Sequence, residues 1–177
     1  MNIPEKITDI NTLEDFIAEP YPETVELMKE LDGDILILGV SGKMGPTLAM
    51  LAVNAIKKSG VQKKVIGAAT FRDEKLRDRL ESFGIETIKC DLLNIDEVRA
   101  LPNAKNVIFM AGRKFGEVGS EALTWMMNAV VPGNVGYARA CGGNIGLRLG
   151  EIILIGKGGQ RRRLGEAVDA KMISDAI

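Results

Sequence analysis

Short segments suited to β-strands alternate with longer stretches of helical pattern along most of this chain. The run 35–39 is apolar up to its closing glycine, which is typical of a strand in a parallel sheet covered by helices on both faces. A repeat of about thirty residues indicates βαβ units, and we predict an α/β fold, a doubly wound, mostly parallel sheet with helices on both faces. The other strands are expected at 64–69, 85–90, 106–110 and 151–155, and the helices at 47–58, 73–83, 95–101, 120–141 and 164–177.

Two shorter helical segments, 12–18 and 22–31, precede the first strand. They make residues 1–31 a helical preface to a single domain of ordinary size at 32–177. In the long helical stretch 120–141, Pro132 has no N–H to donate, so it should kink the helix or restart it. Gly84 should close the helix 73–83.

A glycine-rich turn joins the first strand to its helix, with the spacing Gly39-x-x-Gly42-x-x-Gly45. In a dinucleotide-binding turn the first glycine permits the tight turn, the second admits a pyrophosphate, and the third lets the helix pack on the strand. The phosphates would lie at the helix N-terminus, where the missing N–H of Pro46 is not needed. The alternative is a turn with a structural role only. The expected cofactor contacts in this turn are Gly39, Ser41, Gly42, Lys43, Met44 and Gly45.

The second predicted strand ends where a dinucleotide-binding site recognises the adenosine ribose. A site for NAD usually has an acidic residue here, which binds the 2′-hydroxyl. This chain has Phe71 and Arg72, and the Arg72 guanidinium could pair with a 2′-phosphate or stack on adenine. NAD or NADP is therefore expected, with a preference for NADP. Asp73 follows and is at least as well suited to cap the next helix.

The third and fourth strands end in residues that suit the adenine and the middle of the cofactor. Asp91 could accept a hydrogen bond from the adenine amine while Leu92 makes apolar contact, although a solvent-facing turn explains them equally well. Ala111 and Gly112 would let the cofactor pass close to the backbone. Lys114 could reach phosphate or substrate, against the commoner surface role of lysine.

The composition narrows the expected partners and compartment. The 23 Lys and Arg against 24 Asp and Glu give a net charge of -1, which offers no global attraction to nucleic acid or membrane. No apolar run reaches the ~20 residues of a membrane span and no signal-peptide core is present, so we expect a cytoplasmic protein. Cys90 and Cys141 should be reduced thiols, and with no histidine we expect no metal site. The basic cluster 161–163 is interpreted as a solvated loop rather than a phosphate clamp.

Four motifs together resemble the NAD-dependent epimerase/dehydratase proteins of the extended short-chain dehydrogenase/reductase type. The resemblance covers roughly residues 31–135. It implies a Rossmann-type domain that binds NAD(P) and whose ancestor acted on a sugar or sugar nucleotide. The motifs are the glycine turn, Asp91-Leu92, Ala111-Gly112 and Trp125-x-x-Asn128-x-x-x-Pro132.

The resemblance also assigns roles within the long helical stretch. It implies that Asn128 supports the active site and that the segment 122–141 lies in a homodimer interface. Trp125, Met126 and Met127 would then be interface or core residues, and the core is favoured for methionines at helical spacing.

The chain departs from that family beyond this helix. The family places a Ser or Thr after the fifth strand, then a Tyr-x-x-x-Lys pair, and continues into a region that closes over the substrate. Here Tyr137 precedes the fifth strand and Cys141 stands at the lysine position. Lys114 and Asn128 remain as candidate catalytic residues.

Three interpretations of the function stay open. The first is an NAD(P)-binding relative of sugar-nucleotide epimerases, in which this chain alone lacks the acid–base pair for turnover. The second is a non-catalytic dinucleotide-sensing or interaction module. The third is a truncated or altered remnant, in which the segment from about Gly136 onward replaces the family's continuation. The expected ligands are a dinucleotide and a nucleotide sugar.

Overall fold

The structure is a computed structural model that describes residues 6–113, 119, 121–141, 153–155 and 161–162. Its strands form one sheet in the order β3-β2-β1-β4-β5-β6. The neighbours from β3 to β5 pair in parallel, and β5 and β6 pair antiparallel. This order confirms the predicted doubly wound, mostly parallel Rossmann-type fold. The bounds are β1 Ile35–Leu38, β2 Val65–Ala69, β3 Glu86–Lys89, β4 Asn106–Phe109, β5 Ile153–Ile155 and β6 Arg161–Arg162.

Strand β6 corrects the prediction that the basic cluster is a loop. Arg161 pairs with Ile155 and Arg162 with Leu154. This pairing occupies N–H and C=O groups that β5 would otherwise leave open along the edge of the sheet. Arg163, residues 151 and 152 of the predicted fifth strand and the predicted helix 164–177 lie outside the described residues.

The helices match the predicted segments to within one or two residues at most ends. At the start of α4, Asp73 acts as the helix cap, because its Oδ1 accepts a hydrogen bond from the N–H of Lys75 at 3.0 Å. None of the described helices is both long and apolar enough to cross a bilayer. The bounds are α1 Ile10–Ile17, α2 Pro22–Glu30, α3 Gly45–Ser59, α4 Glu74–Phe83, α5 Ile95–Ala100, α6 Glu121–Trp125, the π-helical turn η1 Met126–Val130 and α7 Val131–Cys141.

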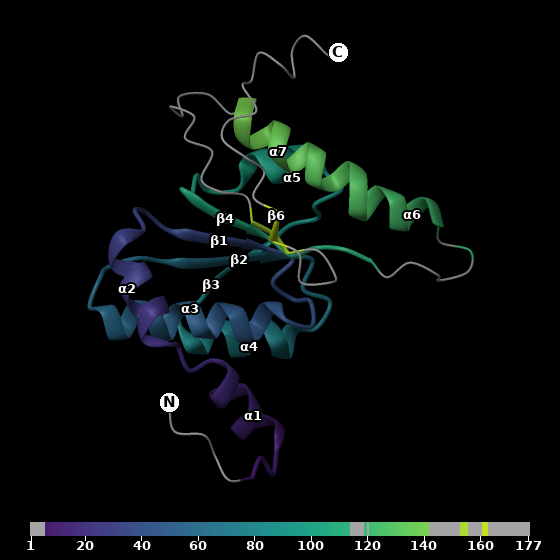
Figure 1. Cartoon of the computed structure of the whole chain (residues 1–177). Helices are drawn as coiled ribbons and strands as arrows, with labels where there is room; N and C mark the ends of the chain where they lie inside the picture. The colour runs from purple at the N-terminus through teal and green to yellow at the C-terminus, as the bar shows by residue number, and fades with distance from the viewer. Residues whose placement is uncertain (1–5, 114–118, 120, 142–152, 156–160, 163–177) are drawn as a thin grey trace.

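Helices cover both faces of the sheet, with α3 and α4 on one face and α5, α6 and α7 on the other (Figure 1). Successive residues of β1 point to opposite faces. Ile35 and Ile37 join the core under α3 and α4, whereas Leu36 and Leu38 join the core under α5 and α7. Burial on both faces explains why this strand is apolar at every position.

The long helix, which consists of α6, η1 and α7 in succession, changes type next to Pro132. The N–H of Val131 donates to the C=O of Met126, five residues back, and this wider spacing defines η1. Helix α7 then begins at Val131, directly before Pro132. Because η1 runs directly into α7, Pro132 lies inside a continuous helical segment, where its missing N–H interrupts the series of intrahelical hydrogen bonds. The predicted restart at Pro132 therefore takes the form of a π-helical turn followed by a new α-helix.

Candidate functional site

The glycine turn begins where β1 and β4 approach each other. Gly39 has a φ of 82°, a left-handed conformation that glycine adopts without strain. A Cβ atom on Gly39 would lie 2.6 Å from the backbone N of Ala111. A side chain at this position would therefore collide with the segment just beyond β4. The positive φ fits the tight turn that was predicted for the first glycine, and the crowding against Ala111 adds a second reason for glycine here.

The third glycine lies where α3 meets the end of the strand. A Cβ atom on Gly45 would be 2.1 Å from the carbonyl O of Val40, so no side chain fits there. The second glycine differs, because a Cβ atom on Gly42 would meet only the carbonyl O of Gly39, at 3.2 Å. Gly42 is also exposed, which leaves the space beside it open to a ligand.

Among the described residues, several backbone N–H groups of the turn have no acceptor in the protein. Two of its N–H groups are used internally: Gly42 donates to the carbonyl of Gly39 at 3.0 Å, and Gly45 to that of Gly42 at 3.2 Å. Within the described part of the chain, the N–H groups of Ser41, Lys43 and Met44 have no protein acceptor. No side chain caps the start of α3. Unpaired N–H groups at a helix N-terminus favour an anion.

The end of β2 combines an unusual backbone conformation with an exposed cation. Phe71 has a φ of 44°, a left-handed conformation that is strained for an aromatic residue. Its side chain is only 2% exposed and packs in the core under α3 and α4. Phe71 was expected to contact the cofactor, and with this side chain buried only its backbone could do so. Arg72, the next residue, is exposed.

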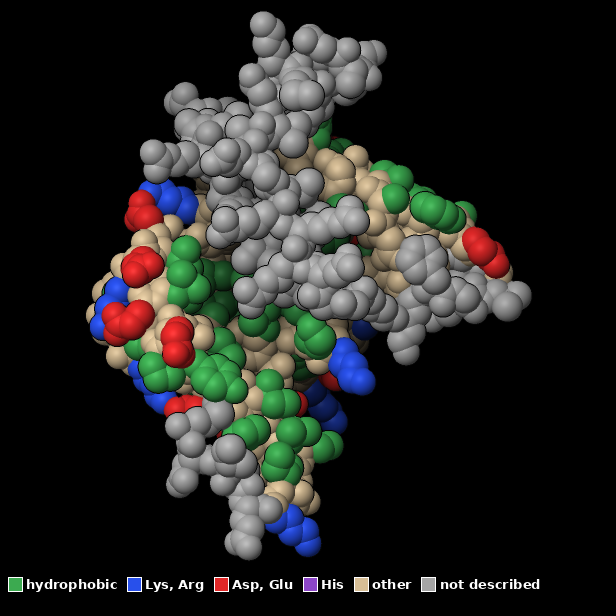
Figure 2. All heavy atoms as spheres, viewed as in Figure 1, with side chains coloured by type: hydrophobic (Ala, Val, Ile, Leu, Met, Phe, Trp, Pro, Cys, Tyr) green, Lys and Arg blue, Asp and Glu red, His purple; other side chains and the backbone are tan. Residues whose placement is uncertain are grey.

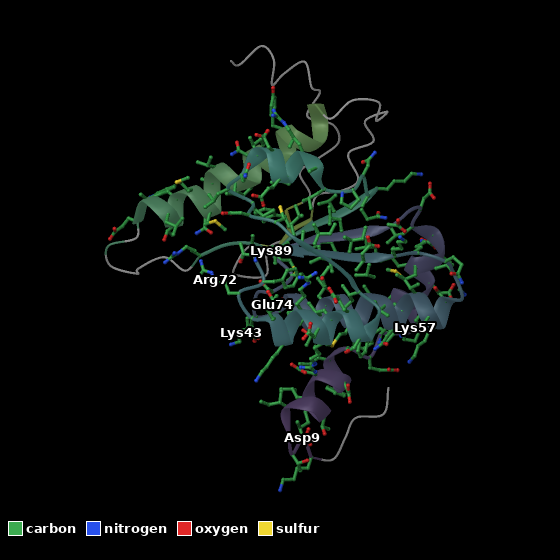
Figure 3. All side chains as sticks on the ribbon, turned by 180° about the vertical axis from the view of Figure 1, so that it is seen from behind. Asp9, Lys43, Lys57, Arg72, Glu74 and Lys89 are labelled. Carbon is green, nitrogen blue, oxygen red and sulfur yellow. The ribbon has the colours of Figure 1, made fainter. Side chains whose placement is uncertain are left out.

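Three cations lie along the carboxyl edge of the sheet, at or just beyond the ends of adjacent strands. Lys43 follows β1, Arg72 follows β2, and Lys89 ends β3 directly opposite Ala69 of β2. Figure 3 shows Lys43, Arg72 and Lys89 toward the same end of the ribbon. All three are exposed, and none of the ion pairs found among the described residues involves them.

The end of β3 forms a small hydrogen-bonded loop. Oδ1 of Asp91 accepts from the N–H of Leu93 at 3.0 Å, and the N–H of Asp91 donates to Oε2 of Glu97 at 2.8 Å. The Asp91 side chain is exposed, so it keeps access to a ligand as well as its place in the turn. Leu92, expected beside adenine, is 5% exposed and belongs to the core under α5 and α7.

The end of β4 is held by Asn128 from the π-helical turn. Oδ1 of Asn128 accepts from the N–H of Arg113 at 2.9 Å, and Nδ2 donates to the C=O of Arg113 at 2.8 Å. A Cβ atom on Gly112 would lie 3.0 Å from the same Oδ1. Ala111 is half-buried beside the glycine turn. Lys114, the other candidate catalytic residue, lies outside the described residues.

Sequence reasoning missed Gly67, which lies in the middle of β2. A Cβ atom on Gly67 would lie 2.8 Å from Cγ1 of Val40, the residue that follows Gly39 in the glycine turn. Gly67 therefore makes room for the Val40 side chain, which is fully buried. A glycine inside an apolar strand is a known sign of such a close approach, so the signal was present in the sequence.

The long helix exposes more apolar surface than expected. Trp125 is 64% exposed and Met126 is 44% exposed, so neither is a core residue. Of the three residues Trp125, Met126 and Met127, only Met127 packs against the core under α5 and α7. Tyr137, further along the same helix, is 41% exposed. Periodicity identified the helix but could not say which of its apolar faces meets the sheet.

Among the described residues, no three His, Cys, Asp or Glu side chains gather in a way that could hold a metal ion. Cys90 is buried and not part of a disulfide. No protein-family model matches this chain, and no curated protein matches it either.

Proposed function

We propose that this chain binds a nicotinamide dinucleotide across the carboxyl edge of its sheet, with the pyrophosphate at the glycine turn. The observation that carries the proposal is the contrast among the three glycines. Gly39 and Gly45 are required by contacts inside the protein, whereas Gly42 faces open space. Within the described part of the chain, the N–H groups of Ser41, Lys43 and Met44, which flank Gly42 in the sequence, have no protein acceptor. An anion approaching the backbone at Gly42 would meet all of these features.

The proposed cofactor is NADP in preference to NAD. Exposed cations follow the ends of β1 and β2, at Lys43 and Arg72. The guanidinium of Arg72 could pair with a 2′-phosphate in a charge-assisted hydrogen bond. Asp73, the first acid after β2 in the sequence, caps α4 through its Oδ1. The first charged residue after β2 is therefore the cation Arg72 and not the acid typical of NAD sites.

The proposed class is a relative of the sugar-nucleotide epimerases and dehydratases. Support for this class comes from the motif resemblance and from the position of Asn128, which fixes the backbone just beyond β4. The cofactor would supply hydride transfer, and the chain would supply binding and orientation.

A second candidate function is a non-catalytic module that binds the dinucleotide and responds to it. Tyr137 favours it, because this tyrosine is exposed on α7 and precedes β5 instead of following it. One helical turn further on, Cys141 stands where a lysine would be needed to lower the tyrosine pKa.

The experiment is calorimetric titration of the full chain with NAD, NADH, NADP and NADPH, compared with the variant Gly42→Val. A valine at position 42 would fill the space that the pyrophosphate needs, so dinucleotide affinity should fall about tenfold or more. The circular-dichroism spectrum should stay unchanged, because a Cβ at this position meets only one carbonyl O, at 3.2 Å. Equal affinity in the two proteins would disprove the pyrophosphate assignment.

A further inference from the structure

The short connection between β2 and α4 is exposed except at one residue. Thr70, Arg72 and Asp73 are all exposed, whereas Phe71 among them is 2% exposed. The Phe71 side chain belongs to the core under α3 and α4, together with Leu80 of α4. Phe71 thus anchors an otherwise solvent-facing connection to the interior of the protein.

The anchored residue has an unfavourable backbone conformation. Phe71 has a φ of 44°, and among the described residues it is the only one other than glycine with a positive φ. A residue with a Cβ atom pays a free-energy cost in this left-handed region that glycine avoids. Such strain persists only where surrounding contacts determine the conformation, and it is concentrated at functional sites. The buried ring of Phe71 supplies those contacts, so the core fixes the direction in which the chain leaves β2.

Arg72 therefore lies between two fixed points of the backbone. On one side is the buried Phe71, and on the other Asp73 accepts a hydrogen bond from the N–H of Lys75 at the start of α4. Within the described part of the chain, no ion pair or side-chain hydrogen bond is found for Arg72. The backbone of Arg72 is held while its guanidinium stays free for a ligand.

We infer that Phe71 is a positioning residue for the phosphate site at Arg72. Its buried ring and left-handed backbone hold Arg72 at the carboxyl edge of the sheet, where the guanidinium meets the 2′-phosphate of NADP. Lys and Arg side chains lie at the surface at this end of the molecule, on the right of the view, where α3 and α4 begin (Figure 2). A cation on a backbone that is already fixed loses less conformational entropy when it binds. The inference rests on the proposed function and assigns the preference for NADP to two adjacent residues, of which only Arg72 contacts the phosphate.

Two isomeric replacements separate the backbone conformation from the burial of an apolar side chain. Phe71→Leu and Phe71→Ile introduce side chains of the same composition, but isoleucine is branched at Cβ and is strongly disfavoured at positive φ. Phe71→Leu should keep the preference for NADP. Phe71→Ile should weaken NADP binding about tenfold and change NAD binding less than about twofold, because NAD has no 2′-phosphate. Calorimetric titration of the full chain with each nucleotide measures both affinities.

The combination with Arg72→Ala shows whether Phe71 acts through Arg72. In the Arg72→Ala chain, which has already lost the phosphate contact, Phe71→Ile should change NADP affinity less than about twofold. Leu80→Ile is the matched control, because Leu80 is fully buried in the same core but lies within α4. It introduces the same β-branched side chain and should leave the ratio of the NADP and NAD affinities unchanged.

The outcomes distinguish this inference from the proposed function. If Phe71→Ile keeps the full preference for NADP, or still weakens NADP binding in the Arg72→Ala chain, the inference is overturned while NADP binding stands. If circular dichroism shows that Phe71→Ile does not fold, Phe71→Gly makes the same comparison, because glycine adopts this φ without the anchor and should also lose the preference. A chain that binds neither nucleotide, or that prefers NAD, overturns the proposed NADP site and this inference with it.

Discussion

The side-chain amide of Asn128 pairs with both backbone groups of Arg113, as a neighbouring strand would. It accepts from the N–H at 2.9 Å and donates to the C=O at 2.8 Å. The pair connects the π-helical turn to the segment directly beyond β4, where the proposed cofactor would cross the sheet. Asn128 thus fixes the backbone at one side of the candidate site.

Replacing Asn128 should therefore cost stability. Asn128→Ala removes both hydrogen bonds and leaves two part-buried backbone groups of Arg113 without this partner, so the free energy of unfolding should fall by about 1–3 kcal/mol. Asn128→Asp keeps an acceptor for the N–H but turns a second oxygen toward the C=O, and it should lose nearly as much. Urea denaturation measures both. Asn134→Ala on α7 is the control, and an equal loss there would argue against a specific role for Asn128.

The glycines of the turn should separate into structural and ligand-facing positions. Gly45→Ala places a Cβ 2.1 Å from the carbonyl O of Val40, so α3 must move away from the strand. We expect a loss of about 1–3 kcal/mol in the free energy of unfolding, typical of overpacking. Gly42→Ala should leave stability within about 1 kcal/mol of the parent, because its neighbour at 3.2 Å needs only a small adjustment. Thermal unfolding of the two variants without ligand makes the comparison, and similar behaviour would contradict it.

Arg72 should set the preference for a phosphorylated ribose. Arg72→Ala should weaken NADP binding by about 1–3 kcal/mol and leave NAD binding nearly unchanged, because only NADP carries the 2′-phosphate. Calorimetry with both nucleotides measures the difference, and Arg79→Ala on the far part of α4 controls for net charge. Tighter binding of NAD than NADP by the unmodified chain would show that Arg72 does not select the cofactor.

Turnover by this chain alone is not expected. General acid–base transfer contributes about 10²–10⁴-fold and needs a group with a suitable pKa within hydrogen-bond reach. Tyr137 is exposed on α7, and the sequence contains no histidine. A panel of nucleotide sugars with both nicotinamides, followed by absorbance and chromatography, provides the measurement. Steady-state turnover that disappears in Lys114→Ala or Asn128→Ala would establish an enzyme instead.

An exposed ion pair at the opposite edge of the sheet predicts a pH effect. A hydrogen bond from Lys105, together with its positive charge, holds the pKa of Asp32 below its ordinary value. A carboxyl whose pKa is lowered by folding adds stability above its unfolded pKa of about 4, and this stability is lost as the pH falls through the folded pKa. Lys105→Ala should raise the Asp32 pKa in an NMR titration. The Glu81 pKa, lowered mainly by the Thr87 hydroxyl, should not move.

Local patterns predicted the sheet and the turn because both depend on residues close in sequence. An apolar run bounded by Gly39 marks β1, and the spacing of three glycines marks the strand, turn and helix that follow. The cap at Asp73 was predictable for the same reason, since its bond spans two residues.

Features that depend on distant contacts were not predictable. Arg161 joins the sheet only because β5 offers an open edge, and two residues carry no strand pattern of their own. The left-handed conformation of Phe71 has no sequence signal, because its buried side chain is fixed by α3 and α4. Similarly, the resemblance pointed to Asn128, but its bond to Arg113 follows from how the long helix lies on the sheet.

The π-helical turn makes the length of this helix as important as its composition. Helix α7 packs on the core through Val131, Val135 and Ala138. Directly before them, the π-helical turn η1 holds one residue more than an α-helical turn would. An α-helix turns by about 100° per residue, so deleting one residue at 129 or 130 would restore regular spacing and rotate Asn128 by roughly that angle. The amide would then point away from β4 although every contacting residue type was kept. Deleting a single residue from this helix could therefore break the contact between η1 and the segment beyond β4 as effectively as a substitution at Asn128.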